Sequence, residues 1–341
     1  MPAWLSELRA FDPLTLPAPS DLAETLVTLL ASPSIASKAW AFRQYDQQVG
    51  INTLVLPGSD AAVLRVKGTR RALAVATDGN GRQVFLDPRA GAAMAVCEAA
   101  RNVSCAGGRP LGVTDCLNFG SPERPEILWQ FAEVVDGIAQ ACRALELPVV
   151  GGNVSFYNET SGPTTSGVPE VQAILPTPII GVVGLLEDAG RLATQSFKGP
   201  GHRIALLGGS AVSFGGSEYL WTLHRRLAGT LAPLDLELER RVQTAVQAVI
   251  DAGLVRAAHD CAEGGLAVTL AEACVSGRER VGCTVSLPAG PERTDLTLFG
   301  EGPSRVVVSV ETPREREFEA LMAESAIPWQ WMGTTGGERL R

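Results

Sequence analysis

Charged and aromatic residues are scarce in this chain of 341 residues, at 19% and 6% of the sequence, while hydrophobic residues reach 45%. This composition argues against a disordered chain and allows a sizeable buried core. Acidic residues outnumber basic ones, and the net charge of -8 argues against non-specific nucleic-acid binding. Nucleotide ligands stay possible, because small phosphates are held by local amides, metal ions and a few cations.

Long apolar runs and paired cysteines are missing as well. No run approaches the roughly 20 residues that span a bilayer, and residues 1–9 lack the layout of a signal peptide. None of the seven cysteines forms a C-x-x-C pair, so we interpret them as reduced core thiols. We therefore expect a soluble, cytoplasmic protein that binds no membrane.

Two common nucleotide-binding motifs are also absent. The chain contains no G-x-x-x-x-G-K-[ST] and no G-x-G-x-x-G before a helix, so neither a P-loop nor a dinucleotide-binding fold is supported. His202 and His224 are scattered, which disfavours a metal site built on histidines.

The length suits two domains better than one compact core. Residues 1–50 are interpreted as a lead-in, in which Asp21 caps a short helix. Residues 51–190 form the first predicted domain. A turn at residues 199–202, rich in glycine and proline, separates it from a second predicted domain at residues 200–341.

The first domain alternates strands and helices. We expect a strand at residues 111–114, an amphipathic helix at 127–145 and a buried strand at 148–150, with a loop after each strand. Strand–helix–strand is an α/β pattern. Asp115 is predicted in the loop after the first of these strands, where ligands gather in α/β sheets. It could bind Mg²⁺ or a nucleotide, or it could simply form a turn.

The stretch from Gly151 to Glu159 carries the most chemistry. Two glycines, Gly151 and Gly152, let a backbone approach a phosphate closely. Asn153 offers a neutral oxygen to a hard cation, and Ser155 offers a hydroxyl to a substrate. An ordinary Gly-Gly turn before a hairpin explains the same residues, and the pattern alone leaves both alternatives open.

Three further polar stretches remain ambiguous. His259-Asp260 precedes a Gly-Gly pair and a predicted helix, so His259 could be a catalytic base, or Asp260 could cap the helix while His259 packs. Asp60 and the loop from Asp78 to Asn80 follow or precede short strands. Acidic groups in two such loops could share one magnesium-bound nucleotide.

Four motifs together resemble one known family, the large synthetase component of formylglycinamide ribonucleotide amidotransferase (phosphoribosylformylglycinamidine synthase). They occur in order and with compatible spacing between about residues 11 and 310. The motifs are PGSDAAVL at Pro57–Leu64, VTDCLNFG at Val113–Gly120, GGNVSFYNE at Gly151–Glu159 and HDCAEGGLA at His259–Ala267.

The resemblance implies a fold and a set of site residues. That component contains two tandem units similar to aminoimidazole ribonucleotide synthetase, each an α/β domain followed by an α+β domain, and this chain resembles the second unit. By the resemblance, Asp115 and Gly152 bind ATP, Asn153 helps to hold Mg²⁺, and Ser155 contacts the ribonucleotide substrate. Asp60, Asp78 and Asn80 would then face a pseudo-symmetric auxiliary nucleotide site.

The implied activity is that of a purine-biosynthesis ligase. ATP phosphorylates the formamide-type oxygen of formylglycinamide ribonucleotide, and ammonia then displaces phosphate to leave an amidine. Catalysis would come mainly from positioning and from Mg²⁺ neutralising phosphate charge. The implied partners are the N-terminal half of the synthetase, a glutaminase subunit that supplies ammonia and a small bridging subunit.

The sequence departs from the family in ways that affect completeness. The first unit is absent, and with it the family's catalytic histidine and most magnesium ligands, so no catalytic residue is assigned to this chain. The loop at residues 160–175 is longer than usual, and the turn at residues 298–305 matches only partly. Two alternatives are a non-catalytic nucleotide-binding scaffold half and another ATP-using member of the same superfamily, such as thiamine-phosphate kinase or selenophosphate synthetase.

Overall fold

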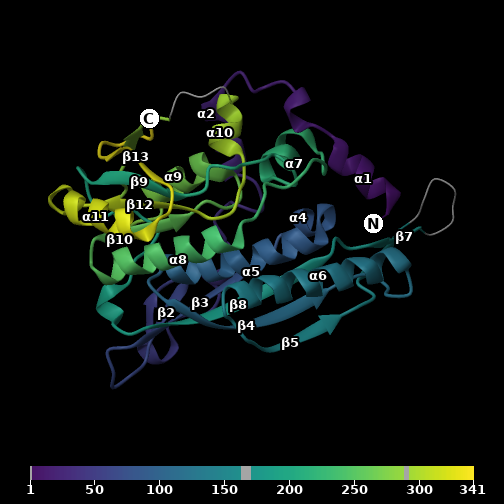
Figure 1. The fold of residues 1–341 in the computed structure, drawn as a ribbon, viewed down its shortest axis with the longest axis horizontal. Helices are drawn as coiled ribbons and strands as arrows, with labels where there is room; N and C mark the ends of the chain where they lie inside the picture. Colours follow the sequence, from purple (N-terminus) through teal and green to yellow (C-terminus); the bar gives the residue numbers. More distant parts are fainter. Residues whose placement is uncertain (1, 163–169, 288–291) are drawn as a thin grey trace.

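The computed structural model describes residues 2–162, 170–287 and 292–341 and contains two main sheets, each covered by helices (Figure 1). The first sheet has six strands in the order β1-β2-β3-β8-β4-β5. Their bounds are β1 Thr53–Val55, β2 Ala62–Arg65, β3 Ala72–Asp78, β4 Arg109–Asn118, β5 Val149–Ser155 and β8 Thr177–Leu186. β4 and β5 run parallel, and the other neighbouring strands of this sheet are antiparallel.

Helices cover one face of this sheet. They are α4 Gly81–Leu86, α5 Pro88–Cys105 and α6 Pro125–Ala144. The side chain of Asp87 caps α5 and Pro88 opens it, as the sequence indicates. Five of the buried residues of α5 are alanines, whose small side chains let the helix lie close to β3, β4 and β8. Val63, Ala74 and Val182 point into this core.

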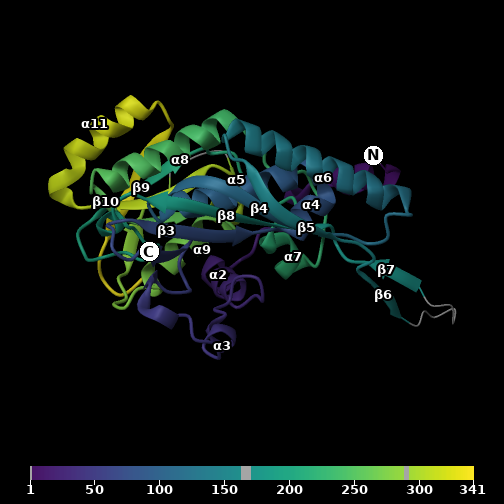
Figure 2. The same cartoon turned by 90° about the horizontal axis from the view of Figure 1, so that it is seen from below.

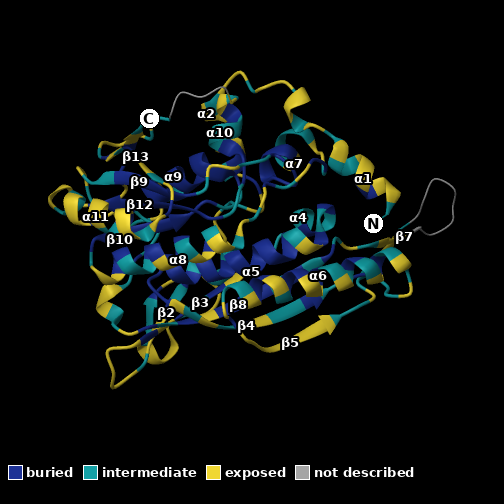
Figure 3. Cartoon of the chain, viewed as in Figure 1, coloured by how far each residue is buried: buried dark blue, intermediate teal, exposed yellow. Residues whose placement is uncertain are grey.

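The opposite face of the first sheet has no described helix against it. Leu64, Leu73 and Val183 are exposed there, since alternate residues of a strand face opposite sides. The edge strand β5 is exposed at every residue except Ser155, which is half-buried (Figure 3). An apolar sheet face and an unpaired edge are surfaces that proteins normally cover.

The second sheet has five antiparallel strands in the order β10-β12-β9-β13-β11. Its strands are β9 Arg203–Gly208, β10 Val255–Asp260, β11 Cys283–Val285, β12 Arg305–Val310 and β13 Trp329–Thr335. The helices α8 Leu236–Asp251 and α11 Glu315–Ser325 pack on one face, and α9 Gly265–Val275 packs on the other. Figure 2 shows α8 beside α5, and these two helices join the two sheet units.

The lead-in segment packs mainly on the second unit. Its elements are α1 Ala3–Ala10, α2 Leu22–Leu30, α3 Ala39–Phe42 and two short 3-10 turns. Asp21 caps α2 as expected. Leu29 is buried in one cluster with Phe214 and Phe299, and α2 contacts α7 Glu218–His224 and α9. Through α10 Thr294–Phe299 and its neighbour Arg293, the second unit also binds the backbone of the segment after α1.

The strand expected to be buried at residues 148–150 lies at the exposed edge of the sheet. Three further expectations are also corrected by the structure. Asp115 lies inside β4 rather than in a loop, because β4 continues to Asn118. The glycine pair at residues 151–152 lies inside β5 and does not end that strand. The loop expected at residues 160–175 contains most of the strands β6 Glu159–Gly162 and β7 Glu170–Ala173, and residues 163–169 of it lie outside the described part of the chain.

Membrane spanning was excluded in the sequence by the lack of long apolar runs. Among the residues that the structure describes, no helix combines the length and apolar character needed to cross a bilayer.

Candidate functional site at the edge of the first sheet

Asp115 and Gly152 form one side of the candidate site. The two residues are paired across β4 and β5. A Cβ atom on Gly152 would lie 2.4 Å from Oδ1 of Asp115, so only glycine leaves room for this carboxylate. Partial burial raises the pKa of Asp115. Its charge in turn acts on Cys142 of α6, which places the carboxylate on the helix-covered side of the sheet.

Asn153 and Ser155 form the other side. Their paired residues on β4 are Cys116 and Asn118, which alternate with Asp115 along the strand. Because alternate residues face opposite sides of a sheet, Asn153 and Ser155 belong to the open face. The four predicted residues therefore lie close together on β4 and β5. Asp115 and Gly152 belong to the helix-covered side of the sheet, and Asn153 and Ser155 belong to the open side.

The hydroxyl of Ser155 is held by a tight turn after β5. Nδ2 of Asn158 lies 3.1 Å from Oγ of Ser155, 2.8 Å from its carbonyl oxygen and 3.0 Å from the carbonyl oxygen of Phe119. Tyr157 adopts a positive φ of 60°, which turns the chain back so that Asn158 reaches Ser155. Sequence analysis pointed to Ser155 but gave Asn158 no role.

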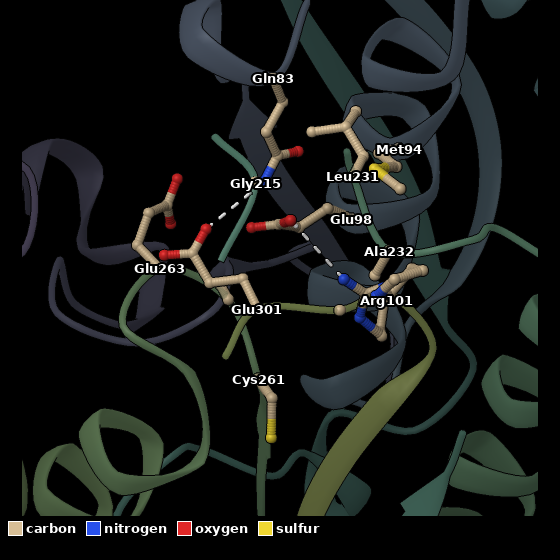
Figure 4. Close-up of a pocket in the computed structure, with 13 residues that line it drawn as sticks. Gln83, Met94, Glu98, Arg101, Gly215, Leu231, Ala232, Cys261, Glu263 and Glu301 are labelled. Carbon is tan, nitrogen blue, oxygen red and sulfur yellow. Dashed lines mark hydrogen bonds and ion pairs between the residues drawn. The ribbon is translucent and has the colours of Figure 1, made fainter. Parts of the chain in front are cut away.

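A second polar site lies between the two sheet units. Figure 4 shows Glu98, Glu263 and Glu301 pointing toward a small cavity of about 20 Å³, with Arg101 and Gln83 at its sides. The carboxylates come from α5, from the turn before α9 and from the segment before β12. Contacts between distant segments build this cavity. Glu263 lies in the HDCAEGGLA motif, but the sequence analysis gave none of the three glutamates a role.

Carboxyl groups in and around the cavity bind protons unusually tightly. Burial, reinforced by the charge of Glu263, raises the pKa of Glu301 to about 8. Burial also raises the pKa of Asp78 and Glu98 well above their usual values. The charge of Glu263 adds to the effect on Asp78, and the charge of Asp78 adds to the effect on Glu98. An excess of buried negative charge of this kind favours a bound cation or a bound proton.

Arg101 is the buried cation of this region. Its side chain is 1% exposed, and its Nη1 lies 2.9 Å from both carboxylate oxygens of Glu239 on α8. Its Nε lies 3.4 Å from Oδ2 of Asp260 at the end of β10. Arg101 thereby ties α5 of the first unit to two elements of the second unit.

His259 forms a second link between the units. Its Nδ1 is 2.6 Å from Oδ1 of Asp60, and its Nε2 is 3.1 Å from Oε2 of Glu272. Burial alone would lower the pKa of His259, but these two carboxylates outweigh it and raise the pKa well above its usual value. The alternative that Asp260 caps the next helix is wrong, because Gly264 occupies the N-cap position of α9.

The polar loops singled out in the sequence take different places. Asn80 caps α4, and its Nδ2 donates to Oε1 of Glu263 at 3.2 Å, so it borders the cavity. The charge of Glu263 raises the pKa of Asp78, and the charge of Asp78 raises the pKa of Glu98. Asp60 does not line the cavity but is bound to His259. Asp60, His259 and Asp260 could also offer three ligand atoms to a metal ion, since these atoms lie within 4.8 Å of one another.

The fold and both polar sites define a class of protein. Residues 58–185 match the family model for the N-terminal domain of AIR synthase related protein, and residues 199–340 match the model for its C-terminal domain. The chain belongs to this family, with an α/β N-terminal domain followed by an α+β C-terminal domain.

Within that class, the chain is similar to one subunit in particular. It is 50% identical, over 98% of its length, to phosphoribosylformylglycinamidine synthase subunit PurL of Synechococcus sp. (strain JA-2-3B'a(2-13)) and 48% identical, over 99%, to that of Moorella thermoacetica. It covers 46% and 45% of these two proteins, so it spans about half the length of the curated relatives it matches, and that half is the C-terminal one.

Solved structures share the fold at lower identity. T. maritima PurL complexed with FGAR gives a TM-score of 0.71 at 17% identity and covers 95% of this chain and 51% of that chain. The HypE–HypF complex gives a TM-score of 0.60 at 17% identity, covering 89% of this chain and 92% of that chain. At this level of identity the likeness shows the fold alone, and PurL and the HypE–HypF complex both share it.

Proposed function

We propose that this chain supplies the second half of the synthetase that converts formylglycinamide ribonucleotide to its amidine in purine biosynthesis. The observation that carries the proposal is the placement of Asp115, Gly152, Asn153 and Ser155 on adjacent positions of β4 and β5, at an unpaired sheet edge. Relatives that are about 50% identical carry the synthase name and are about twice as long. The site residues lie in residues 51–190, which we propose as the nucleotide-binding domain.

The open face of the first sheet supports a partner with the same kind of sheet. Leu64, Leu73 and Val183 form an exposed apolar surface on β2, β3 and β8, and β4 lies between this surface and the exposed strand β5. We propose that the N-terminal half of the synthetase covers this surface and completes the site from the other side. A glutaminase subunit and a small bridging subunit would complete the assembly, and a structure of PurLQS from Thermotoga maritima supports such a complex for that protein.

ATP fits the edge site in its chemistry. The absence of a side chain at Gly152 leaves the Asp115 carboxylate reachable from solvent, where it can accept hydrogen bonds from a nucleoside. T. maritima PurL has been solved with ATP, ADP and AMPPCP, and these ligands support the same substrate here. ATP is a substrate of the proposed reaction, and its γ-phosphoryl group is transferred to the formamide oxygen.

Mg²⁺ fits the site only in part. The amide oxygen of Asn153 is a suitable ligand for this hard cation, and it is exposed on the open face. One neutral oxygen is not a complete coordination sphere, so the remaining ligands would come from phosphate oxygens, water and the other half. When bound, Mg²⁺ would neutralise charge on the phosphates.

The residues of this chain would act by positioning. Asp115 and Gly152 hold the nucleoside end of ATP on one side of β5, while Asn153 and Ser155 face the phosphates and the ribonucleotide on the other side. Phosphorylation turns the formamide oxygen into a leaving group, ammonia forms the new carbon–nitrogen bond, and phosphate departs. Holding both substrates in line is what such a site contributes to the rate.

A second candidate function is a nucleotide-binding scaffold half without catalytic residues. The carboxylate-rich cavity favours it, because Mg²⁺ carried by a bound nucleotide would neutralise the negative charge of Glu98, Glu263 and Glu301. We propose that an auxiliary nucleotide binds near Asp78 and Asn80, next to this cavity. The two functions are compatible, because a chain can bind one nucleotide structurally while its edge strand completes the reaction site.

Replacing Asp115 tests the edge site directly. In the assembled enzyme, Asp115→Ala should weaken ATP binding about tenfold or more, the value of a hydrogen bond to a charged group. Isothermal titration with a non-hydrolysable ATP analogue measures this. Glu324→Ala, which removes an exposed carboxylate from α11, is the matched control and should leave the affinity unchanged. An unchanged affinity for Asp115→Ala would remove this residue from the ATP site.

A further inference from the structure

The turn after β5 holds the side-chain amide of Asn158 against the hydroxyl of Ser155, which we propose contacts the substrate. Asn158 is the last residue of this turn, and its backbone N–H donates to the carbonyl oxygen of Phe119 at 3.0 Å. Its backbone carbonyl accepts from Ile174 at 3.0 Å. The backbone of Asn158 is therefore tied to the end of β4 and to the segment after β7.

Aromatic packing against α6 and the end of β4 holds the same turn in place. Phe156 lies between Ser155 and Asn158 in sequence and contacts Phe131 with ring centroids 5.1 Å apart. Phe131 in turn contacts the buried Phe119 at 5.4 Å. This anchor on α6 and β4 leaves little freedom for the turn, so the amide of Asn158 is presented to Ser155 in one orientation.

The orientation of the amide follows from its surroundings. Nδ2 faces two carbonyl oxygens, those of Phe119 and Ser155, and a carbonyl group can only accept hydrogen bonds. The nitrogen must therefore be on this side. The same nitrogen lies 3.1 Å from Oγ of Ser155, so one of its two N–H groups is shared between the carbonyl oxygen and Oγ of Ser155. The alternative bond, from the Ser155 hydroxyl to Oδ1 of Asn158, is longer at 3.4 Å.

We propose that Asn158 is a positioning residue whose amide N–H donates to Oγ of Ser155 and leaves the Ser155 O–H free to donate to an acceptor oxygen of the ribonucleotide. The inference rests on the proposed function, because it requires Ser155 to contact that substrate. It goes further by naming the direction of the hydrogen bond. The group recognised on the substrate is then an acceptor, such as a phosphate or carbonyl oxygen, and not a hydroxyl or amine donor.

Asn158→Asp separates this role from simple turn formation. Aspartate keeps the size of asparagine but its side chain has no N–H, so its carboxylate would accept a hydrogen bond from the Ser155 hydroxyl and turn that O–H away from the substrate. We expect Asn158→Asp to raise KM for the ribonucleotide more than Asn158→Ala does. KM for ATP should change by less than about twofold in both variants, since Asp115 and Gly152 lie on the other side of β5.

A double-mutant cycle provides the decisive test. Steady-state kinetics of the assembled enzyme, with ammonium as the nitrogen source, would be measured for Ser155→Ala, Asn158→Ala and the double variant. Ser155→Ala should raise KM for the ribonucleotide about tenfold, and Asn158→Ala should raise it about three- to fivefold. If Asn158 acts through Ser155, the double variant should match Ser155→Ala alone.

The cycle also distinguishes two kinds of failure. If Ser155→Ala leaves KM for the ribonucleotide unchanged, the proposed role of Ser155 is wrong, and the inference about Asn158 is lost with it. If Ser155→Ala raises KM but the effect of Asn158→Ala adds in full, only the positioning role is wrong. Gln247→Ala is the matched control, because its amide donates to the hydroxyl of Ser104 in the contact between α8 and α5 and not to Ser155, and its effect should be additive.

Discussion

The edge of the first sheet and the cavity between the two units differ in how they hold polar groups: the edge exposes them to solvent, and the cavity encloses them. At the edge, Gly151, Gly152 and Asn153 are exposed, and their polar groups are open to a ligand. In the cavity, Glu98, Arg101 and Glu301 are enclosed by both units and are paired or protonated. Water solvates an exposed polar site until a partner chain binds. The charges of an enclosed site must be neutralised by other residues of the chain or by a ligand.

The largest effect is expected where the enclosed region loses its cation. Arg101→Met removes the partner of Glu239 and Asp260 and leaves two buried carboxylates without a counter-charge. Breaking a buried ion pair from one side costs about 3–5 kcal/mol of unfolding free energy. Urea denaturation monitored by circular dichroism measures this. Arg89→Ala, which breaks exposed ion pairs on α5, should cost less than about 1 kcal/mol.

A loss for Arg101→Met no larger than that of Arg89→Ala would show that the enclosed region does not depend on Arg101. The contrast between the two regions would then lie in exposure alone and not in their charge balance.

An intermediate effect is expected at the edge site, in binding rather than in stability. Gly152→Ala places a methyl group against the Asp115 carboxylate, and we expect ATP affinity of the assembled enzyme to fall about tenfold. Gly151→Ala is the matched control, because a Cβ there meets nothing within 4 Å. Titration with an ATP analogue compares the two. Equal affinities for both variants would show that the Asp115–Gly152 contact does not matter for ATP.

A third effect, of at most about 1.4 kcal/mol for each pH unit, concerns how stability depends on pH. The pKa of Glu301 is raised from its usual 4.5 to about 8, so the folded chain binds this proton more tightly than the unfolded chain does. Stability from this group is therefore fully present below pH 4.5 and is lost as the pH rises toward 8. Glu301→Gln should flatten the decline by at most about 1.4 kcal/mol per pH unit.

Denaturation curves between pH 5 and pH 8 check this slope. Glutamine keeps an oxygen that can accept from the backbone N–H groups of Gly264 and Glu218, as Glu301 does. The exposed Glu324 provides the control, since Glu324→Gln should leave the slope as it is. A slope that Glu301→Gln does not change would mean that the cavity carboxylate titrates normally.

The contrast between the regions also explains what sequence could predict. The helix α6 was expected at nearly its observed position, because helical periodicity specifies it. The pair Asp87-Pro88 specifies the start of α5. The residues of the edge site were named from contiguous motifs. Their placement inside β4 and β5 was missed, since glycine and aspartate disfavour strands and only the parallel pairing of two distant segments overrides that preference.

The cavity was largely beyond sequence reasoning. Arg101 stands in an alanine-rich helix, and its partners Glu239 and Asp260 are more than one hundred residues away along the chain. His259 was noticed, but its partners Asp60 and Glu272 come from different elements. Pairings of this kind depend on how the two units dock, which no local pattern encodes.

The central claim is that the edge site works only when a second half covers it. Amidine formation from formylglycinamide ribonucleotide, ATP and ammonia should be measured for this chain alone, for the N-terminal half alone and for their mixture. The account predicts turnover for the mixture only, and much reduced turnover when the mixture contains Asp115→Ala. Turnover by this chain alone at the rate of the mixture would contradict it.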